Sequence, residues 1–467
     1  MKKSFLFSLA ALAFAVSCDK SSESFNVQYE QSKELTTDEL KALSWYKTNP
    51  RISADEATAN AQSIIQFLDA GNQTKAAAPR SISTVKPVTR AKKTKSADDA
   101  NPDTVAYVFN FGQDDGYAIL SADRRTDPIF AIVPEGHIDF SEDVDESLLS
   151  TGIVEFYGNL EAAYDRQVEF AIRMQDSLVS SAMAKIAAGD DMAGTKAKIR
   201  PELELIEDEP RVEYGPTSYV VTVAPMISVR WGQTNPYNLY TPVISGIQAP
   251  TGCAATAVAQ LMSYWRYPAS YNWSVMMPAS GNETLSTFQT ISHLMSDVGA
   301  GLNVQYGKTQ SSAYFSDIPG YLSGLGYNPG LYKGYNKTDV SQSLSNGRPV
   351  LIAGSSIKKD VYKKYLIFWE KYSHTYYEGS HAWIIDGSMK AMTPIYVVRG
   401  GKRELSSYVT IPLVHCNWGW PELGIDGYYN EGSFNSNNGP VTRAHTDTYG
   451  TEGNFQYNIE CITNIYK

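Results

Sequence analysis

A short stretch near the middle of the chain, PTGCAATAVAQLMSYW at 250–265, constrains the fold more than any other feature. A glycine places Cys253 directly before a run of small residues, and Val258, Leu261 and Met262 follow at helical spacing. The pattern predicts a loop that ends with Cys253 at the first turn of a buried helix. At that position the helix dipole and free N–H groups stabilise a thiolate, which is the form that attacks a carbonyl carbon. A small buried cysteine packed on an apolar helix fits the same pattern. A partner base elsewhere in the chain is therefore needed to support the interpretation of Cys253 as a nucleophile.

Among the six histidines, His381 is the best placed to be that base. It lies in GSHAWIIDG at 379–387, where an apolar run bounded by glycine predicts a strand with His381 at its start. A histidine on a strand, facing a cysteine at a helix N-terminus, is the arrangement that a Cys/His pair requires. The two residues are 128 positions apart (381 − 253), so only the fold can bring them together. A strand-end histidine bonded to a carbonyl is the alternative.

Two other stretches carry groups that complete such a site. In HCNWGW at 415–420, Asn417 can set the tautomer of an imidazole by a hydrogen bond, and Trp418 can shield it from water. In RWGQTNPYN at 230–238, the amide of Gln233 can donate hydrogen bonds to a tetrahedral oxyanion, together with the backbone N–H of Cys253.

The order of the strings GQTNPYN, TGCAATAVAQLMSYWRYP, GSHAWIIDG and HCNWGW resembles the streptopain family of secreted bacterial cysteine peptidases, including the interpain-like enzymes. The resemblance runs from about Met226 to the C-terminus, and residues 107–136 look like the inhibitory pro-domain of that family. It implies the following roles: Cys253 as nucleophile, His381 as general base, Gln233 as oxyanion stabiliser, and Asn417 and Trp418 as residues that orient and shield His381. Candidates for the substrate cleft are Gly252, Gly379 and Ser380.

Composition bounds the class of protein. A chain of 467 residues with 43% hydrophobic residues can build two or three domains with a sizeable core. The net charge of −10 argues against nucleic acid as a partner. Cysteines stand at 18, 253, 416 and 461 without a CxxC spacing, which argues against a zinc site, and the expected chemistry needs no metal or organic cofactor. Cys416 and Cys461 are the candidates for a disulfide, with a buried thiol at Cys416 as the alternative.

The first residues predict export. Lys2 and Lys3 precede an apolar segment at 5–16 that is too short to span a bilayer stably. It ends in AVSC, which resembles a lipoprotein cleavage box with Cys18 as the lipidated residue; an ordinary signal peptide cut nearby is the alternative. The expectation is an outer-membrane or cell-surface lipoprotein of a Gram-negative bacterium, with a periplasm-facing or released form left open. A lipid anchor would make the membrane a partner.

The expected division is a lipoprotein signal peptide at 1–17, a pro-domain at 18–210 and a streptopain-like peptidase domain at 211–467. Within the pro-domain, 73–103 reads as flexible and 189–213 as a charged linker. In the peptidase part, helices precede strands. This order predicts an α+β, papain-like fold with a helical lobe and an antiparallel sheet lobe, preceded by an α+β pro-domain. The predicted elements are helices at 37–45, 53–68, 145–188, 253–267, 284–298 and 340–344, and strands at 106–111, 117–120, 350–353, 381–385, 395–399, 408–416 and 427–429.

Three stretches depart from the family pattern. Residues 357–378, rich in Tyr and ahead of His381, predict an extended hairpin or a short helix, with a wall of the substrate cleft as the alternative. Residues 391–412 are also long, and the family's Gly-rich loop near the C-terminus has no obvious match. His415 and Cys416 do not form a local dyad, because adjacent residues on a strand point to opposite faces.

These observations predict an exported cysteine endopeptidase that is made as a zymogen. The Cys253 thiolate attacks a peptide carbonyl, His381 protonates the leaving amine, and water releases the acyl-enzyme. The expected partners are protein or peptide substrates and the chain's own pro-domain as inhibitor. Two other functions are alternatives: a surface binding protein on an inactive peptidase fold, in which Cys253 and His381 are only structural, and an acyltransferase or amidase with the same dyad.

Overall fold

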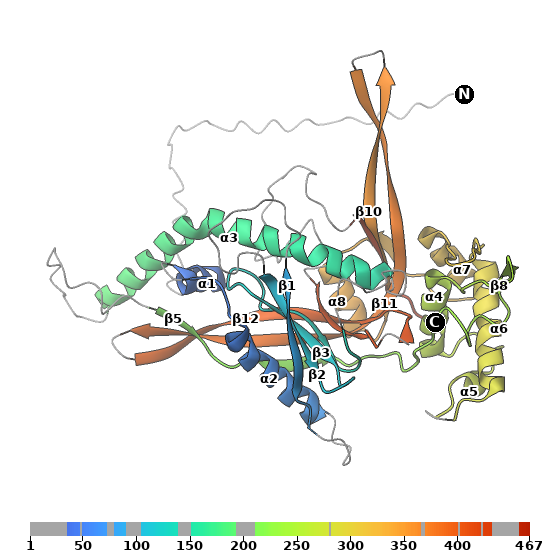
Figure 1. The fold of residues 1–467 in the computed structure, drawn as a ribbon, viewed down its shortest axis with the longest axis horizontal. Helices are drawn as coiled ribbons and strands as arrows, with labels where there is room; N and C mark the ends of the chain where they lie inside the picture. Colours follow the sequence, from blue (N-terminus) through green and yellow to red (C-terminus); the bar gives the residue numbers. More distant parts are fainter. Residues whose placement is uncertain are drawn as a thin grey trace, which may run out of the picture.

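The computed structural model describes residues 35–46, 49–71, 79–89, 104–138, 151–192, 211–279, 282–365, 369–399, 402–421, 424–431 and 457–467. Its centre is a 12-stranded sheet (Figure 1). The strand order is β1-β2-β3-β4-β13-β12-β11-β10-β14-β9, and β5 and β6 both pair with β11. Every pairing in this sheet is antiparallel.

The strands of this sheet are β1 (Ile82–Thr89), β2 (Thr104–Phe111), β3 (Tyr117–Ser121), β4 (Ile129–Val133), β5 (Arg211–Tyr214), β6 (Ser218–Val223), β9 (Leu331–Gly334), β10 (Val350–Tyr365), β11 (Trp369–Arg399), β12 (Lys402–Asn417), β13 (Gly427–Asn430) and β14 (Tyr457–Thr463). A separate small hairpin joins β7 (Val243–Ile244) to β8 (Ile247–Gln248).

The N-terminal part combines strands β1 to β4 with the helices α1 (Thr37–Trp45), α2 (Ala54–Gly71) and α3 (Thr151–Met192). A capping box starts α1: the Glu39 N–H donates to Thr36 Oγ1 at 3.2 Å, and the Thr36 N–H donates to the Glu39 carboxylate at 2.7 Å. All residues of β2, β3 and β4 are buried, because apolar clusters cover both faces of these strands. The predicted helices at 37–45 and 53–68 and strands at 106–111 and 117–120 are confirmed.

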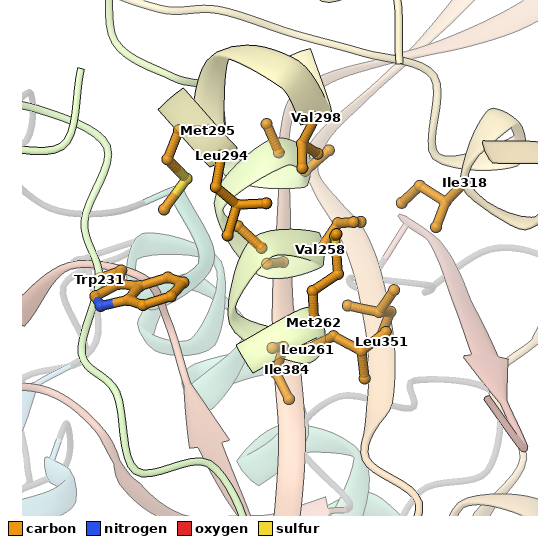
Figure 2. Close-up of a cluster of buried hydrophobic side chains, with 14 of the residues drawn as sticks. Trp231, Val258, Leu261, Met262, Leu294, Met295, Val298, Ile318, Leu351 and Ile384 are labelled. Carbon is orange, nitrogen blue, oxygen red and sulfur yellow. The ribbon is translucent and has the colours of Figure 1, made fainter. Parts of the chain in front are cut away.

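The C-terminal part adds the helices α4 (Cys253–Trp265), α5 (Trp273–Met276), α6 (Leu285–Gly301), α7 (Ile318–Gly324) and α8 (Lys337–Ser345). Apolar residues of α4 pack between α6 and the sheet, where Val258 and Leu261 meet Leu294 of α6 and Ile384 of β11 in one cluster (Figure 2). This arrangement confirms the α+β fold class, with helices first and antiparallel strands later.

Two long hairpins distinguish the sheet. Strands β10 and β11 stay paired out to Tyr365↔Trp369, and this ribbon projects from the body of the molecule (Figure 1). It confirms the extended hairpin expected for 357–378. Strands β11 and β12 stay paired out to Arg399↔Lys402. The separate strands expected at 381–385 and 395–399 are therefore one continuous strand, β11.

Two segment boundaries differ from expectation. The expected flexible segment 73–103 contains β1, whose backbone pairs with β2 along Ile82–Thr89. Pro87 fits there because β1 is an edge strand, where a missing N–H costs no ladder bond. The expected linker 189–213 is shorter, since α3 continues to Met192 and β5 begins at Arg211; residues 193–210 lie outside the described residues.

The candidate disulfide between Cys416 and Cys461, which the sequence left open, is not formed. Both are free, buried thiols, which confirms the alternative for Cys416. Cys416 lies on β12 and Cys461 on β14, and two strands separate these in the sheet. Three strand spacings of ~4.8 Å give roughly 14 Å, whereas a disulfide needs Cα atoms within about 7 Å.

The signal peptide at 1–17 and Cys18 lie outside the described residues. Within the described ranges, no helix has the length and apolar character needed to cross a bilayer.

The N-terminal and C-terminal parts share the large sheet. Strand β4 pairs with β13 through Ile132↔Tyr428 and Ala131↔Tyr429. The apolar clusters on both faces also mix residues of the two parts. The expected pro-domain is thus joined to the expected peptidase domain by backbone hydrogen bonds and by a shared core.

Candidate active site

Cys253 is the first residue of α4, as predicted. Gly252 before it has φ +91°, and a Cβ there would lie 3.1 Å from the carbonyl oxygen of Ser311, so the turn favours glycine on both counts. Burial raises the pKa of the Cys253 thiol, while the backbone N–H groups of Ala382, Ala254 and Cys253 itself act in the opposite direction. In this conformation the thiol is protonated at neutral pH.

The Gln233 loop is fastened beside the start of α4. The Thr251 N–H donates to the Gln233 carbonyl at 2.9 Å, two residues before Cys253. From α4, the Gln260 amide donates to the Trp231 carbonyl at 2.7 Å. The structure therefore brings Gln233 to the helix end that carries the thiol, and it assigns Gln260 a positioning role that the sequence did not reveal.

His381 is buried on β11, and its ring lies against two tryptophans. The ring centroid is 6.0 Å from that of Trp383 and 6.4 Å from that of Trp418. His381 Nε2 is 3.0 Å from the Trp418 carbonyl oxygen. Since a carbonyl only accepts, Nε2 carries the proton. Burial lowers the pKa of His381 to about 4, so the imidazole is neutral at neutral pH.

The imidazole of His381 and the thiol of Cys253 lie on opposite faces of the sheet. Ala382 and Ile384 belong to the core around α4, whereas Trp383 belongs to the core on the other face. Side chains alternate along a strand, so His381 shares the face of Trp383. The expected facing of His381 and Cys253 is therefore not present in this structure. His381 is bonded to a carbonyl, as in the alternative, but it lies within β11 and not at a strand end.

Asn417 and Trp418 have different surroundings. Trp418 lies against the His381 ring and accepts its hydrogen bond, as a shielding residue would. Asn417 pairs with Ile384 and so faces α4, where its amide donates to the Val229 carbonyl at 3.1 Å and its oxygen accepts from the Gly419 N–H at 3.2 Å. In this conformation Asn417 fastens β12 to the segment before Gln233, and these contacts do not orient His381.

Of the three cleft candidates, two are consecutive residues on β11 and the third directly precedes Cys253. Ser380 is exposed, and its Oγ is 2.6 Å from the Oγ of Ser355 on β10. Ser380 shares the strand face of Ala382, which is the face of Cys253. Gly379 precedes it in β11, and Gly252 precedes the thiol.

Two buried carboxylates support the site, and sequence reasoning did not single them out. Asp386, at the end of the string GSHAWIIDG, accepts the Ile227 N–H at 2.8 Å, and its other oxygen is 2.7 Å from His415 Nδ1. Asp426 accepts the Trp418 N–H at 2.8 Å. Burial raises the pKa of Asp426 to about 6. The contacts of Asp386 and Asp426 join different strands and loops, so no local sequence pattern predicts them.

The described ranges contain no group of three or more His, Cys, Asp or Glu residues placed to hold a metal ion.

A thiol at a helix N-terminus, a histidine on a nearby strand and a glutamine loop bonded through its backbone to Thr251 are the groups that a cysteine-peptidase site uses, with the histidine here on the opposite face of the sheet. The comparison with known families agrees: residues 231–429 match the Peptidase C10 family. Residues 49–150 match the Spi protease inhibitor family. The chain therefore carries a streptopain-like peptidase domain preceded by an inhibitor-like pro-domain.

Individual relatives point the same way. Streptopain of Streptococcus pyogenes is 28% identical over 243 residues, which cover 43% of this chain and 53% of streptopain. The thiol protease/hemagglutinin PrtT of Porphyromonas gingivalis is 23% identical over 370 residues, which cover 69% of this chain and 33% of PrtT. The chain thus spans about half the length of the streptopain that it matches.

Among solved structures, a prointerpain A fragment of Prevotella intermedia is similar with a TM-score of 0.41 and 18% identity, covering 74% of this chain and 91% of the fragment. Active interpain A of the same organism is similar with a TM-score of 0.34 and 21% identity, covering 52% of this chain and 95% of interpain A.

Proposed function

We propose that the chain is a cysteine endopeptidase made as a zymogen. The observation that carries the proposal is the thiol of Cys253 at the start of α4, with backbone N–H groups directed at it from α4 and from Ala382, inside the region that matches Peptidase C10. Such N–H groups stabilise a thiolate and, after attack, an oxyanion.

The proposed reaction uses His381 as the proton carrier. His381 takes the proton of the Cys253 thiol, the thiolate adds to the peptide carbonyl, and the Gln233 amide with the Cys253 N–H binds the oxyanion. The imidazolium then gives its proton to the leaving amine. Water, deprotonated by His381, releases the acid product and restores the thiol.

The observed conformation fits the latent form of such an enzyme. Burial raises the pKa of Cys253 and lowers the pKa of His381 to about 4, so both groups are neutral and no thiolate–imidazolium pair forms. Trp383 and Trp418, against which the His381 ring lies, share a core with the pro-domain residues Phe130 and Leu160. We infer that the bound pro-domain stabilises the turned-away imidazole, and that activation moves His381 to the face of Cys253.

Export and membrane attachment belong to the same proposal. The box AVSC and the apolar segment before it support a lipid anchor at Cys18, which would place the enzyme on an outer membrane or cell surface. Attachment keeps a peptidase near extracellular protein substrates and away from the cytosol.

The test is to react the matured protein with a thiol-directed peptidyl electrophile, map the adduct and measure hydrolysis of casein. Labelling of Cys253 together with casein hydrolysis is the expected result. Cys253→Ala is the control. It should lose casein hydrolysis because the proposed nucleophile is gone, and it should lose labelling because the Cys416 and Cys461 thiols are buried. Labelling without hydrolysis would indicate an acyltransferase or amidase, and absence of labelling would indicate a binding protein.

A further inference from the structure

The hairpin of residues 389–399 on β11 and 402–413 on β12, called the arm below, belongs to the peptidase domain and has one apolar face. Along β12, Val409, Ile411 and Leu413 are 4%, 2% and 0% exposed, whereas the intervening Thr410 and Pro412 are exposed. This strict alternation is typical of a strand with one face in a core and the other in water.

The pro-domain forms the rest of that core. The cluster joins the arm to apolar side chains of α1, α2, β2, β3 and β4, among them Leu40, Ala61, Ile64, Phe109, Phe111, Leu120 and Ile132. Figure 1 shows α1 alongside the arm, and α2 contacts β6, which pairs with the arm. With the pro-domain gone, Ile411 and its neighbours on this face would lose these contacts and be exposed to water.

The strands β5 and β6 extend the same contact. They pair with the arm along the other edge of β11, through Ile395↔Tyr214 and Met389↔Val221. The Tyr214 hydroxyl donates to Ser44 Oγ on α1 at 3.0 Å. The ring of Tyr219 lies 5.1 Å from that of Phe67 on α2. A cut within 193–210 leaves β5 and β6 with the peptidase, so these contacts do not depend on the linker.

A second contact, called the seam below, adjoins the base of the arm: β4 pairs with β13, and Asn430 of β13 pairs with Leu413 of β12. Besides the strand pairing, the Asn430 amide donates to the Ile129 carbonyl at 3.0 Å, and Arg230 forms an ion pair with Glu135. The pro-domain is therefore held at the seam and the arm, and also by the core that Leu160 of α3 shares with Trp383 and Trp418.

We propose that the arm is a docking site for the chain's own pro-domain, and that it keeps the pro-domain bound after the linker is cut. This inference rests on the proposed zymogen. Apolar cores that two parts complete together are typical of permanent interfaces, and strand addition at the seam supplies backbone hydrogen bonds. While the linker is intact, it keeps the pro-domain at a high effective concentration near the peptidase domain. Cutting the linker removes that effect and leaves every contact of the interface in place. The inhibitor then leaves only when the pro-domain itself is degraded or unfolded.

The experiment uses the full chain with Cys253→Ala, which prevents self-cutting, and a recognition site for a specific endoprotease placed within 193–210. After cleavage, size-exclusion chromatography and native mass spectrometry report whether the pro-domain stays with the peptidase. We expect one complex of both fragments. Ile411→Asp should raise the dissociation constant ~100-fold or more, because it buries an unpaired charge. Thr410→Asp, one residue away on the exposed face, should leave retention unchanged.

Ile411→Ala provides a milder variant if Ile411→Asp fails to fold, and faster dissociation of the cut complex is its expected effect. Prompt loss of the pro-domain from the unaltered interface would overturn retention. Equal retention by the parent, Ile411→Ala and Thr410→Asp would show that contacts outside the arm hold the pro-domain, and it would overturn the role of the arm. Because every readout is association, a failure of the peptidase proposal shows separately, in the labelling of Cys253.

Discussion

His381 Nε2 donates a hydrogen bond to the carbonyl oxygen of Trp418 over 3.0 Å, and this bond points the imidazole away from the face of the sheet that carries Cys253. The bond lies in a core to which the pro-domain contributes. In the proposed zymogen, latency therefore follows from side-chain direction on one strand: the alternation of β11 places the proposed base His381 on the face opposite to the proposed nucleophile Cys253.

The buried, neutral state of His381 predicts a pH dependence of stability. Its pKa is about 4 in the fold against 6.5 ordinarily, so between these values the unfolded imidazole binds a proton that the folded one does not. The free energy of unfolding therefore falls as pH drops from 6.5 to 4, by about 3 kcal/mol at ~1.4 kcal/mol per pKa unit. Asp426 acts the other way, because burial raises its pKa to about 6.

Comparison with His381→Gln isolates the imidazole, since Asp426 contributes equally to both chains and the Gln amide can still donate to Trp418. In a Cys253→Ala background, urea unfolding at pH 7 and pH 4 measures the effect. The parent should lose about 3 kcal/mol more than His381→Gln over this range. Parallel losses in the two chains would show that His381 is not buried as a neutral group.

Gln233→Ala should lower kcat of the matured enzyme by about 10²–10³, the usual effect of removing one oxyanion donor, with KM little changed. The reason is the position of the Gln233 loop, which is fastened to Thr251 beside the thiol. Steady-state hydrolysis of a peptide substrate measures both constants. Thr234→Ala is the matched control, because Thr234 is the next residue and is exposed. A rise in KM at constant kcat would instead make Gln233 a substrate-positioning residue.

Cys18→Ala should move the protein from the membrane pellet to the soluble fraction, because acyl chains on Cys18 would be its anchor. Fractionation of cells that express each form measures the distribution, and sequencing the mature N-terminus identifies the cleaved bond. A mature protein that begins elsewhere, or that pellets equally without Cys18, would exclude the lipid anchor.

Maturation should cut the chain within 193–210. On either side the backbone is hydrogen-bonded, in α3 up to Met192 and in β5 from Arg211, and proteases cleave exposed backbone outside such elements. Mass spectrometry of the incubated protein locates the new N-terminus. The Cys253→Ala chain should stay intact in the absence of another protease; its spontaneous cleavage at the same bond would contradict self-processing.

The sequence predicts the parts of the site better than their arrangement. The helix that starts at Cys253 and the strand that contains His381 are encoded locally, by a glycine turn and by apolar runs. The face of β11 on which His381 lies depends on pairing with β10 and β12 and on the core shared with the pro-domain, and neither is a local signal. The same limit explains why the sequence left the pairing of Cys416 and Cys461 open, because the strand order that separates them involves pairings between distant segments.

Strand extent was also hard to predict. Strand β11 runs through Gly387 and Pro394, residues that ordinarily interrupt a strand, and pairing with β12 carries it past both. Strand β1 lies in the segment 73–103, which as a whole is rich in Lys, Ala, Thr and Ser, so the composition of the segment indicates flexibility. The strand also contains Pro87, which its place at the edge of the sheet permits.

The pH dependence of Cys253 alkylation tests the central claim most directly, because it reports whether the thiol is paired with His381. In the uncut chain, alkylation by a small reagent should be slow at neutral pH and increase only in the alkaline range, as a raised thiol pKa requires. In the matured enzyme, after the cut pro-domain has also been removed, alkylation should be fast and nearly constant to below pH 7, as a thiolate–imidazolium pair gives. Matured His381→Ala should return to the profile of the uncut chain. One common profile for the uncut and matured forms, or no effect of His381→Ala, would contradict the account.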